Sequence, residues 1–419
     1  MAVQDPSPLR QFIRQALVRT AVGVVGIQAA TIGGLVGYDA LTKNQRKARS
    51  GFPKPGRYAA DVASSDIDVF TFGADLYDDM LSRIDSATQS VFLESYIWKG
   101  DEYGQKFLDA VNRAAERGVD VRVIYDGFGN LVVPARFYRQ FHPDVRVLRF
   151  PVVRPQLLIT PLRASGLTHR KLLVVDDVVA YVGGYNLGST YATEWRDTHL
   201  RVVGPDSWVL RQSFVTVWNT LMSNEEEQIA RLDPPEWDSR VRCWSNLPMR
   251  RVYPIRGMYL QAIDRATHHI YISTPYFIPD HQILDALIRA QARGVDVRIM
   301  VPMDSNHVLA DWGSRGFYVT LLKAGVTLLL YKNAMIHAKT ATIDGVWSTV
   351  GTANIDRLSL SFNYEVNLEI VDNDLAAVME RVFEVDSSNA HRLTLEEWQD
   401  RHPFAWVAEA ALAPLRPLL

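Results

Sequence analysis

The first long apolar segment of the chain covers residues 21–38 and contains no charged side chain. A helix needs about 20 mostly apolar residues to cross a bilayer. Gly33 and Gly37 have the spacing of a helix contact face in membranes. The pattern therefore predicts one N-terminal membrane anchor and a homodimer contact through it, with a cleaved signal peptide or a buried helix as alternatives. Flanking basic residues slightly favour a cytoplasmic catalytic part.

Helical and extended patterns then alternate twice along the chain. The first series predicts helices near 74–87 and 104–117 and strands at 91–98 and 119–126. The second series predicts a helix near 256–266, a strand at 270–277, a helix ending near 293 and a strand at 295–302. The hexapeptide RGVDVR occurs in both, at 117–122 and 293–298. This order indicates a duplicated α/β unit, each copy holding a mixed sheet with helices on both faces.

The predicted fold class is thus α/β, with two duplicated domains around a pseudo-twofold site and an N-terminal membrane helix. A length of 419 residues fits two domains. The predicted segments are an anchor with its basic flank at 1–50, a first domain at 51–235, and a second domain with a C-terminal tail at 236–419. For the tail, packing on the second domain and contact with a membrane interface both remain open.

A second repeat carries the polar positions. Residues 169–197 match residues 337–365 without a gap. The matched pairs are His169 and His337, Lys171 and Lys339, Asp176 and Asp344, Gly183 and Gly351, Asn186 and Asn354, and Asp197 and Glu365. One such motif alone is more often a surface pair. Two copies inside a duplicated α/β unit predict a single site built by both halves.

The spacing of these residues predicts their geometry. Histidine and lysine two positions apart on a strand share one face. Asp176-Asp177 and Asp344-Gly345 resemble two-residue hairpin turns. Such turns would place His169 opposite residue 184 and His337 opposite residue 352, so that each asparagine lies at a strand end beside its own histidine.

The two acidic positions of each copy receive different roles. Asp176 lies seven residues from His169, or roughly 23 Å along a strand, so we predict that Asp176 and Asp344 are structural, with Gly183 and Gly351. Asp197 and Glu365 follow a longer return of the chain. Each is predicted to bond one ring nitrogen of the histidine in its own copy, which fixes the tautomer.

This set of side chains predicts phosphoryl chemistry. One neutral histidine could attack phosphorus while the other, protonated, acts as acid and then base. Lysine and asparagine would hold the nonbridging oxygens. We expect no metal and no cofactor, since Cys243 is the only cysteine and no zinc-protease, EF-hand or P-loop motif occurs.

Charge narrows the class of partner. The formal net charge is −2 and the pI is about 6.6, which gives no overall footprint for a nucleic acid. Residues 134–171 nevertheless carry seven arginines against one acid, and they include an apolar run at 151–162. Arginine beside apolar residues suits an anionic lipid surface. An ordinary solvated loop is the alternative interpretation.

The chain resembles the phospholipase D superfamily, most closely its bacterial cardiolipin synthase branch. The resemblance is carried by both histidine motifs and by four further segments: ESYIWKGDEYG at 94–104, WRD at 195–197, STPYFIPD at 273–280 and NIDRLSLSFNYE at 354–365. It implies metal-independent phosphatidyl transfer between two phosphatidylglycerol molecules through a phosphohistidine, with glycerol released. By this analogy His169 is the nucleophile and His337 the acid and base.

Other functions remain open on the sequence alone. A phospholipase D would deliver the same intermediate to water, and a nuclease of the superfamily is disfavoured by the acidic balance and the anchor. An inactive lipid-binding or scaffold protein is the alternative of another class. We expect phospholipid substrates, with phosphatidylglycerol first, no nucleic acid, and a location in the bacterial cell membrane.

Overall fold

The computed structural model describes residues 33–34, 37, 51–54, 56–152, 166–222, 224–234, 239–401 and 403–413. Within these ranges, no helix combines the length and the apolar character that a membrane span requires. Apart from three glycines, the predicted anchor at 21–38 lies outside the described residues. The predicted domain boundary at 235/236 also falls in a gap between them.

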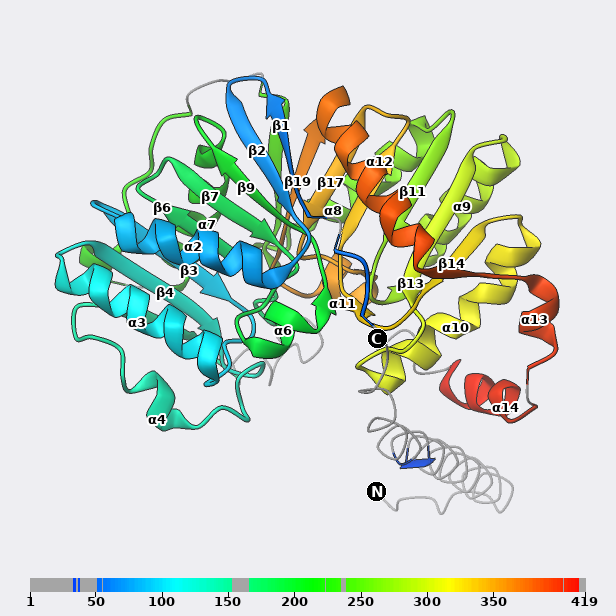
Figure 1. Cartoon of the computed structure of the whole chain (residues 1–419), viewed down its shortest axis with the longest axis horizontal. Helices are drawn as coiled ribbons and strands as arrows, with labels where there is room; N and C mark the ends of the chain where they lie inside the picture. The colour runs from blue at the N-terminus through cyan, green and yellow to red at the C-terminus, as the bar shows by residue number, and fades with distance from the viewer. Residues whose placement is uncertain are drawn as a thin grey trace, which may run out of the picture.

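The first sheet has eight strands in the order β1-β2-β9-β7-β6-β3-β4-β5 (Figure 1). Along this order β4 pairs in parallel with β3 and with β5, and the other neighbouring strands pair antiparallel. The strands are β1 Arg57–Val62, β2 Ser65–Phe70, β3 Ser90–Ser95, β4 Asp120–Asp126, β5 Arg146–Phe150, β6 Leu172–Val175, β7 Val179–Gly183 and β9 His199–Val203. The helices of this half are α2 Gly73–Ser86, α3 Glu102–Glu116, α4 Ala135–Tyr138, α6 Ser189–Thr193 and α7 Ser207–Leu221.

The second sheet repeats this plan in the order β10-β19-β17-β16-β11-β13-β14-β20. Its strands are β10 Val241–Asn246, β11 His269–Ser273, β13 Asp296–Pro302, β14 Thr327–Tyr331, β16 Thr340–Ile343, β17 Trp347–Gly351, β19 Glu365–Val371 and β20 Ala390–Leu393. Its helices are α8 Pro254–Arg265, α9 His281–Ala292, α10 Val308–Lys323, α11 Arg357–Ser361, α12 Asn373–Ser388, α13 Leu395–Gln399 and α14 Pro403–Leu412. The predicted duplicated α/β fold is confirmed, with β1 and β20 as the unmatched edge strands.

Local sequence explains where the repeated helices begin. The carboxylate of Asp101 accepts a hydrogen bond from the N–H of Gly104 and caps α3. Asp280 caps α9 in the same way, accepting from the N–H groups of Gln282 and Ile283. An aspartate at this position satisfies N–H groups that have no partner within the helix. Both helices therefore start at equivalent points after the first central strand of each half.

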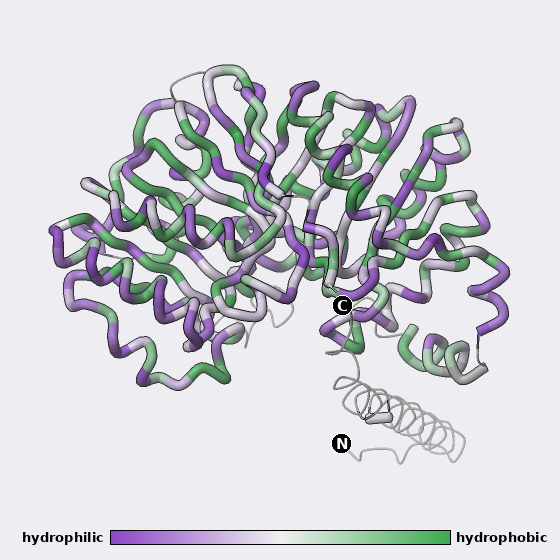
Figure 2. Tube along the Cα trace, viewed as in Figure 1, coloured by the Kyte–Doolittle hydropathy of each residue, from purple (hydrophilic) through white to green (hydrophobic). Residues whose placement is uncertain are grey.

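The two halves pack face to face. Helix α7 contacts β6 and β7 of its own sheet and also β10, whereas α12 contacts β16 and β17 and also β1. One buried apolar cluster contains residues of both halves, including Phe214 and Leu368. Figure 2 shows hydrophobic residues along the strands of both sheets. The layers are thus outer helices, sheet, α7 with α12, sheet, and outer helices.

The described part of the C-terminal tail lies on the second half. Ala408 and Leu412 of α14 are buried in a cluster that includes Val308, Leu309 and Trp312 of α10. For residues 403–413, this packing favours the predicted contact with the second domain over the predicted membrane contact.

The hairpins that carry the histidine motifs differ by one residue from prediction. Asp176 and Asp177 have positive φ and form the expected tight turn, closed by a bond from the N–H of Val178 to the carbonyl of Val175. The ladder, however, pairs Val175 with Val179. The second hairpin pairs Ile343 with Trp347. Each loop is therefore three residues long, and the predicted pairing of His169 with residue 184 and of His337 with residue 352 is wrong.

Candidate active site

Each motif histidine is attached by its backbone to the opposite half. The N–H of His169 donates to the carbonyl of Tyr364 at 3.0 Å, and the N–H of His337 donates to the carbonyl of Arg196 at 2.7 Å. Around these bonds, strand β15 (Met335–Ile336) pairs with β8 (Trp195–Arg196), and a single bridge joins Thr168 to Tyr364. The centre of the molecule is therefore held together by two short cross-connections related by the repeat.

The carboxylates also cross between the halves. Nδ1 of His169 lies 3.1 Å from each carboxylate oxygen of Glu365. Nδ1 of His337 lies 2.7 Å from Oδ2 of Asp197. The prediction that each histidine bonds the carboxylate of its own copy is wrong. The physical reason is that β7 and β9 lie against β17 and β19 at the interface, so the residues beside these strands face the other half.

The two motif lysines are buried in this centre. Nζ of Lys171 donates to the carbonyl of His169 at 2.6 Å, and Nζ of Lys339 donates to the carbonyl of His337. The pKa of Lys171 is lowered to about 7, first because the group is buried; Glu365 opposes this effect and Lys339 adds to it. Burial lowers the pKa of Lys339 to about 8. The free pocket thus disfavours the charged forms of both lysines, and a bound anion would stabilise them.

The pKa of each histidine is lowered, first because the imidazole is buried. Lys171 and Lys339 lower both values further, while Glu365 partly offsets the effect on His169. The pKa of His337 falls well below its ordinary value. Burial raises the pKa of its partner Asp197 to about 6. In the free pocket both imidazoles are therefore neutral near pH 7, and Nε2 of each is the nitrogen not engaged by a carboxylate.

The two asparagines have different partners, although the sequence predicts the same role for both. Oδ1 of Asn186 accepts from the N–H of Ile97 at 3.1 Å, which leaves its NH2 group for other acceptors. Nδ2 of Asn354 donates to Asp356 at 3.0 Å, and its buried Oδ1 has no hydrogen-bond partner among the described residues. Of the two asparagines, only Asn186 therefore has an NH2 group available to donate to a phosphate oxygen, as predicted for both.

Asp356 was not predicted as a site residue. It is buried and caps α11 by accepting from the N–H of Ser359 at 2.7 Å. Burial raises the pKa of Asp356 to about 6, against the lowering effects of the Ser359 and Asn354 donors. Its position two residues after the motif asparagine, where the first copy has Gly188, was a visible signal in the repeat.

Asp176 and Asp344 lie at the turn ends of their hairpins, away from the histidines. The carboxylate of Asp176 accepts backbone N–H bonds from Thr88, Gln89 and Ser90. Asp344 accepts from the equivalent residues of the second half, Thr267, His268 and His269. Burial alone would raise the pKa of each carboxyl, but these donors outweigh it and lower the pKa. The contacts agree with the structural role predicted for both residues.

Gly183 and Gly351 sit where adjacent chains approach closely. A Cβ at Gly183 would overlap the backbone of Thr198 and His199, and one at Gly351 would overlap Val366 and Asn367. A side chain at either position would push β9 or β19 away from the site. These contacts agree with the structural role predicted for the two glycines.

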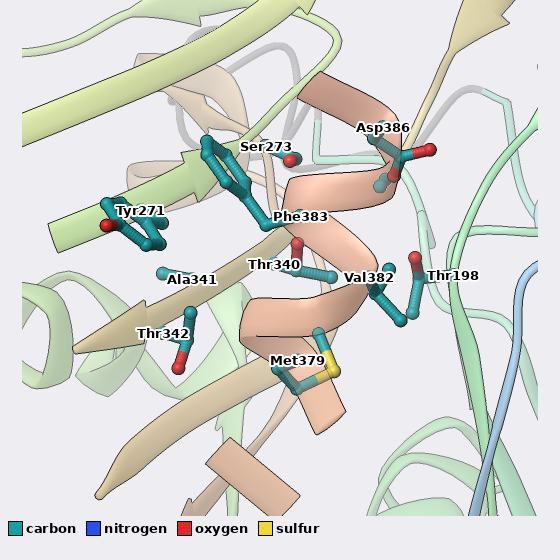
Figure 3. Close-up of a pocket in the computed structure, with 11 residues that line it drawn as sticks. Thr198, Tyr271, Ser273, Thr340, Ala341, Thr342, Met379, Val382, Phe383 and Asp386 are labelled. Atoms are coloured by element: carbon teal, nitrogen blue, oxygen red, sulfur yellow. The ribbon is translucent and has the colours of Figure 1, made fainter. Parts of the chain in front are cut away.

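Two buried ion pairs flank the histidines and were missed in the sequence. Nε of Arg170 lies 3.0 Å from Oε2 of Glu94. Arg196 makes a two-point contact with Asp386 at 2.9 and 2.7 Å, which fixes the residue before Asp197. Figure 3 shows Asp386 on α12, on the side of Thr198. The available signal was an arginine directly beside a motif residue at two positions of the first copy, 170 and 196, where the second copy has Ala338 and Tyr364.

The space in Figure 3 between α12 and the strands β11 and β16 is too small for a substrate. Its volume is about 10 Å3, which is room for about one water molecule. In the described part of the chain, no group of three or more His, Cys, Asp or Glu side chains is arranged to hold a metal ion.

Comparison with known proteins agrees with this geometry. Residues 80–218 and 259–387 match the family model described as "Cardiolipin synthase, PLD-like domain". The chain belongs to this family. It is similar to the major cardiolipin synthase ClsA of Bacillus subtilis, with 34% identity covering 86% of this chain and 77% of the relative. It is also similar to a cardiolipin synthase of Staphylococcus aureus, with 33% identity covering 85% and 74%.

Solved structures share the fold at low sequence identity. Phosphatidylserine synthase of Haemophilus influenzae superposes with a TM-score of 0.66 and 16% identity, covering 87% of this chain and 97% of that protein. Polyphosphate kinase of Porphyromonas gingivalis reaches a TM-score of 0.55 at 13% identity, covering 85% of this chain and 53% of the kinase. Within this family, the duplicated fold predicted from the sequence is confirmed.

Proposed function

We propose that the protein is a phosphatidyltransferase that makes cardiolipin from two phosphatidylglycerol molecules through a phosphohistidine. The observation that carries the proposal is the crossed pair: His169 with Glu365, and His337 with Asp197, beside two buried lysines. Two oriented imidazoles supply a nucleophile and a proton donor in one pocket. The cardiolipin synthases at 33–34% identity support the choice of substrate.

In the first step, Nε2 of His169 attacks the phosphorus of one phosphatidylglycerol. The N–P bond forms as the P–O bond to the terminal glycerol breaks, and His337 gives its proton to the departing glycerol oxygen. In the second step, a hydroxyl of another phosphatidylglycerol attacks the phosphorus and its proton passes to His337. The N–P bond breaks, His169 is restored, and the products are cardiolipin and glycerol.

Charge in the pocket supports this sequence of steps. Lys171, Lys339 and the NH2 group of Asn186 would hold the nonbridging oxygens of the phosphodiester. The negative charge of the bound phosphodiester raises the pKa of His337 and of both lysines, because an opposite charge favours the protonated forms. Substrate binding thereby supplies the imidazolium that the free pocket disfavours. Glu365 stabilises the positive charge that develops on His169.

The acceptor alcohol would face a different part of the pocket. Oδ1 of Asn354 and the carboxylate of Asp356 accept hydrogen bonds, whereas a phosphate needs donors. The glycerol of the second phosphatidylglycerol carries two hydroxyl donors. We therefore assign Asn354 and Asp356 to positioning these hydroxyls, which replaces the predicted phosphate contact of Asn354.

The membrane setting belongs to the same proposal. Residues 21–38 would anchor the chain in the bacterial cell membrane, with the catalytic part on the cytoplasmic side. Gly33 and Gly37 would form a homodimer contact between two anchors. Fractionation of cells and crosslinking of cysteines placed at 33 and 37 test these points.

The decisive experiment gives the purified full chain phosphatidylglycerol in detergent. We expect cardiolipin and glycerol in equal amounts, and no product from the variant His169→Ala. Phosphatidic acid as the only lipid product would instead identify a hydrolase. Lipid binding without turnover would identify an inactive lipid-binding protein.

A further inference from the structure

The loop that follows β4 exposes three large apolar side chains within five residues. Phe128, Leu131 and Val132 are 51%, 59% and 79% exposed. Single exposed apolar residues are ordinary on protein surfaces, but clusters mark sites of interaction. None of the three was predicted as a functional residue. We name residues 127–134 the β4 loop.

Hydrogen bonds hold the β4 loop in this conformation. Oδ1 of Asp126 accepts from the N–H groups of Phe128 and Gly129, both at 2.8 Å. Asn130 donates to the carbonyls of Tyr96 and Asp126 at 2.9 and 2.7 Å, and its Oδ1 accepts from the N–H of Trp98 at 2.8 Å. The apolar side chains are therefore presented to the outside by a braced backbone.

A groove of about 600 Å3 lies beside the loop. Its lining combines Leu131, Val132 and Tyr138 with Arg139 and Arg149. The ring of Tyr138 stacks on Tyr125 at 4.3 Å, which gives the groove a flat apolar wall. The volume is within the range of lipid- and ligand-sized pockets.

Exposed arginines surround this apolar surface. Arg136, Arg139 and Arg149 are exposed, and among the described residues none of the three has a carboxylate within ion-pair distance. By contrast, Arg146 nearby pairs with Asp120. Unpaired arginines around an apolar tip complement an anionic bilayer, where cations meet phosphates and apolar side chains meet acyl chains.

The β4 loop is joined directly to the catalytic centre. Oδ2 of Asp126 accepts from the N–H of Thr168, the residue before His169, at 2.9 Å. The ring of Tyr96, whose carbonyl Asn130 binds, lies edge-on to the imidazole of His169 at 4.9 Å. A bilayer touching this loop would consequently lie beside the histidine that attacks phosphorus.

We propose that the β4 loop docks the catalytic part on an anionic lipid bilayer. Phe128, Leu131 and Val132 enter the interfacial region, and Arg136, Arg139 and Arg149 bind lipid phosphates around them. This inference rests on the proposed function, because it specifies how the same site reaches lipids in a membrane.

The first test measures insertion without using activity. The full chain, with Cys243→Ser, is reconstituted in vesicles after labelling Val132→Cys with an environment-sensitive fluorophore. Val178→Cys is the matched control, since Val178 is 52% exposed in the same half but on the hairpin turn far from His169. We expect a blue shift and strong quenching by lipid-borne nitroxides at position 132 only, and more strongly with phosphatidylglycerol than with phosphatidylcholine alone.

Equal signals at positions 132 and 178, or no quenching at position 132, would overturn the docking proposal. Equal insertion into pure phosphatidylcholine would overturn the role of the arginines. These results do not depend on turnover, so they can be told apart from a failure of the proposed function.

A second test uses activity. The double variant Leu131→Ser, Val132→Ser should raise KM for phosphatidylglycerol in vesicles about tenfold or more, because each buried aliphatic side chain contributes strongly to partition. With short-chain phosphatidylglycerol dissolved as monomers, kcat should change less than twofold. Val178→Ser should change neither value. An equal loss on vesicles and on monomers would mean that the loop supports the site and does not dock.

Discussion

The two halves contribute the same His, Lys and Asn, but they hold their histidines differently. Nδ1 of His169 faces both oxygens of Glu365 and also the carbonyl of Thr352, all at 3.1 Å. Nδ1 of His337 faces one oxygen of Asp197 at 2.7 Å. Thr352 also donates to Glu365 at 2.6 Å, where the first half has Gly184. The first histidine is thus fixed by several acceptors, and the second by one.

This difference is consistent with different roles for the two histidines, one as nucleophile and the other as acid and base. A nucleophile benefits from a fixed orientation toward phosphorus. A histidine that gives and takes a proton benefits from a partner whose pKa is near the working pH, and burial raises the pKa of Asp197 to about 6. The comparison therefore supports His169 as the nucleophile. The following predictions test it.

Removing either histidine should have the largest effect. We expect His169→Ala and His337→Ala each to lower kcat by about 10^4-fold or more, because each group acts in both steps. The enzyme is incubated with labelled phosphatidylglycerol and then denatured rapidly without acid. The wild type should retain covalently bound label, and His337→Ala should also acquire it, but more slowly. Label retained by His169→Ala and lost from His337→Ala would reverse the assignment.

Neutralising the crossed carboxylates should come next. We expect Glu365→Gln and Asp197→Asn each to lower kcat by about 10^2- to 10^4-fold, since the histidine loses its tautomer and the stabilisation of its charged form. Glu365→Gln should slow formation of the covalent intermediate. Asp197→Asn should in addition shift the pH profile of its breakdown. The opposite result, with a shifted pH profile for Glu365→Gln and only slower formation for Asp197→Asn, would contradict the crossed pairing.

The two lysines should make kcat/KM depend on pH, each over a different pH range. In the free enzyme the pKa of Lys171 is about 7 and that of Lys339 about 8, so both lose charge as the pH rises through these values. We expect kcat/KM for phosphatidylglycerol to fall by up to about tenfold per pH unit for each lysine that deprotonates.

Single lysine variants sharpen this test. Lys339 lowers the pKa of Lys171. Lys339→Met should therefore move the remaining alkaline limb to higher pH, in addition to weakening binding. In Lys171→Met the limb should remain near pH 8. An alkaline limb that stays near pH 7 in Lys339→Met would show that the lysines are not coupled in this way.

Replacing Asp356 should have the smallest effect on activity among these variants. Asp356→Asn keeps a side-chain oxygen for the cap on α11 but removes the charge beside Asn354. We expect the ratio of cardiolipin to phosphatidic acid to fall about tenfold, while formation of the covalent intermediate changes less than threefold. Thermal unfolding controls for stability. An unchanged product ratio would contradict a role in positioning the acceptor.

Much of the fold followed from local pattern. The predicted helix at 104–117 corresponds to α3, and the strands at 119–126 and 295–302 correspond to β4 and β13 within one residue at either end. The strand at 270–277 was too long, because β11 ends at Ser273 and the chain turns before β12 (Phe277–Ile278). An apolar sequence alone does not reveal where a strand leaves its sheet.

The β4 loop illustrates a second limit. The density of arginines predicts a lipid contact within residues 134–171. Arg136, Arg139 and Arg149 lie in that range, but Phe128, Leu131 and Val132 precede it. Their exposure depends on the hydrogen bonds that Asp126 accepts from N–H groups of the loop and on those that join Asn130 to Tyr96 and Trp98. In the sequence alone, apolar residues after a strand equally predict burial.

The sequence by itself determined the duplication, the order of helices and strands, the placement of His169 with Lys171 and of His337 with Lys339, and the tight turns at Asp176 and Asp344. These features depend on residues close in sequence and on the two periodicities of secondary structure. Only the tertiary structure decided that Glu365 serves His169 and Asp197 serves His337. The reason is that the identity of a histidine's partner depends on how the two sheets face each other, and an internal repeat is equally compatible with pairing within a copy and pairing across copies.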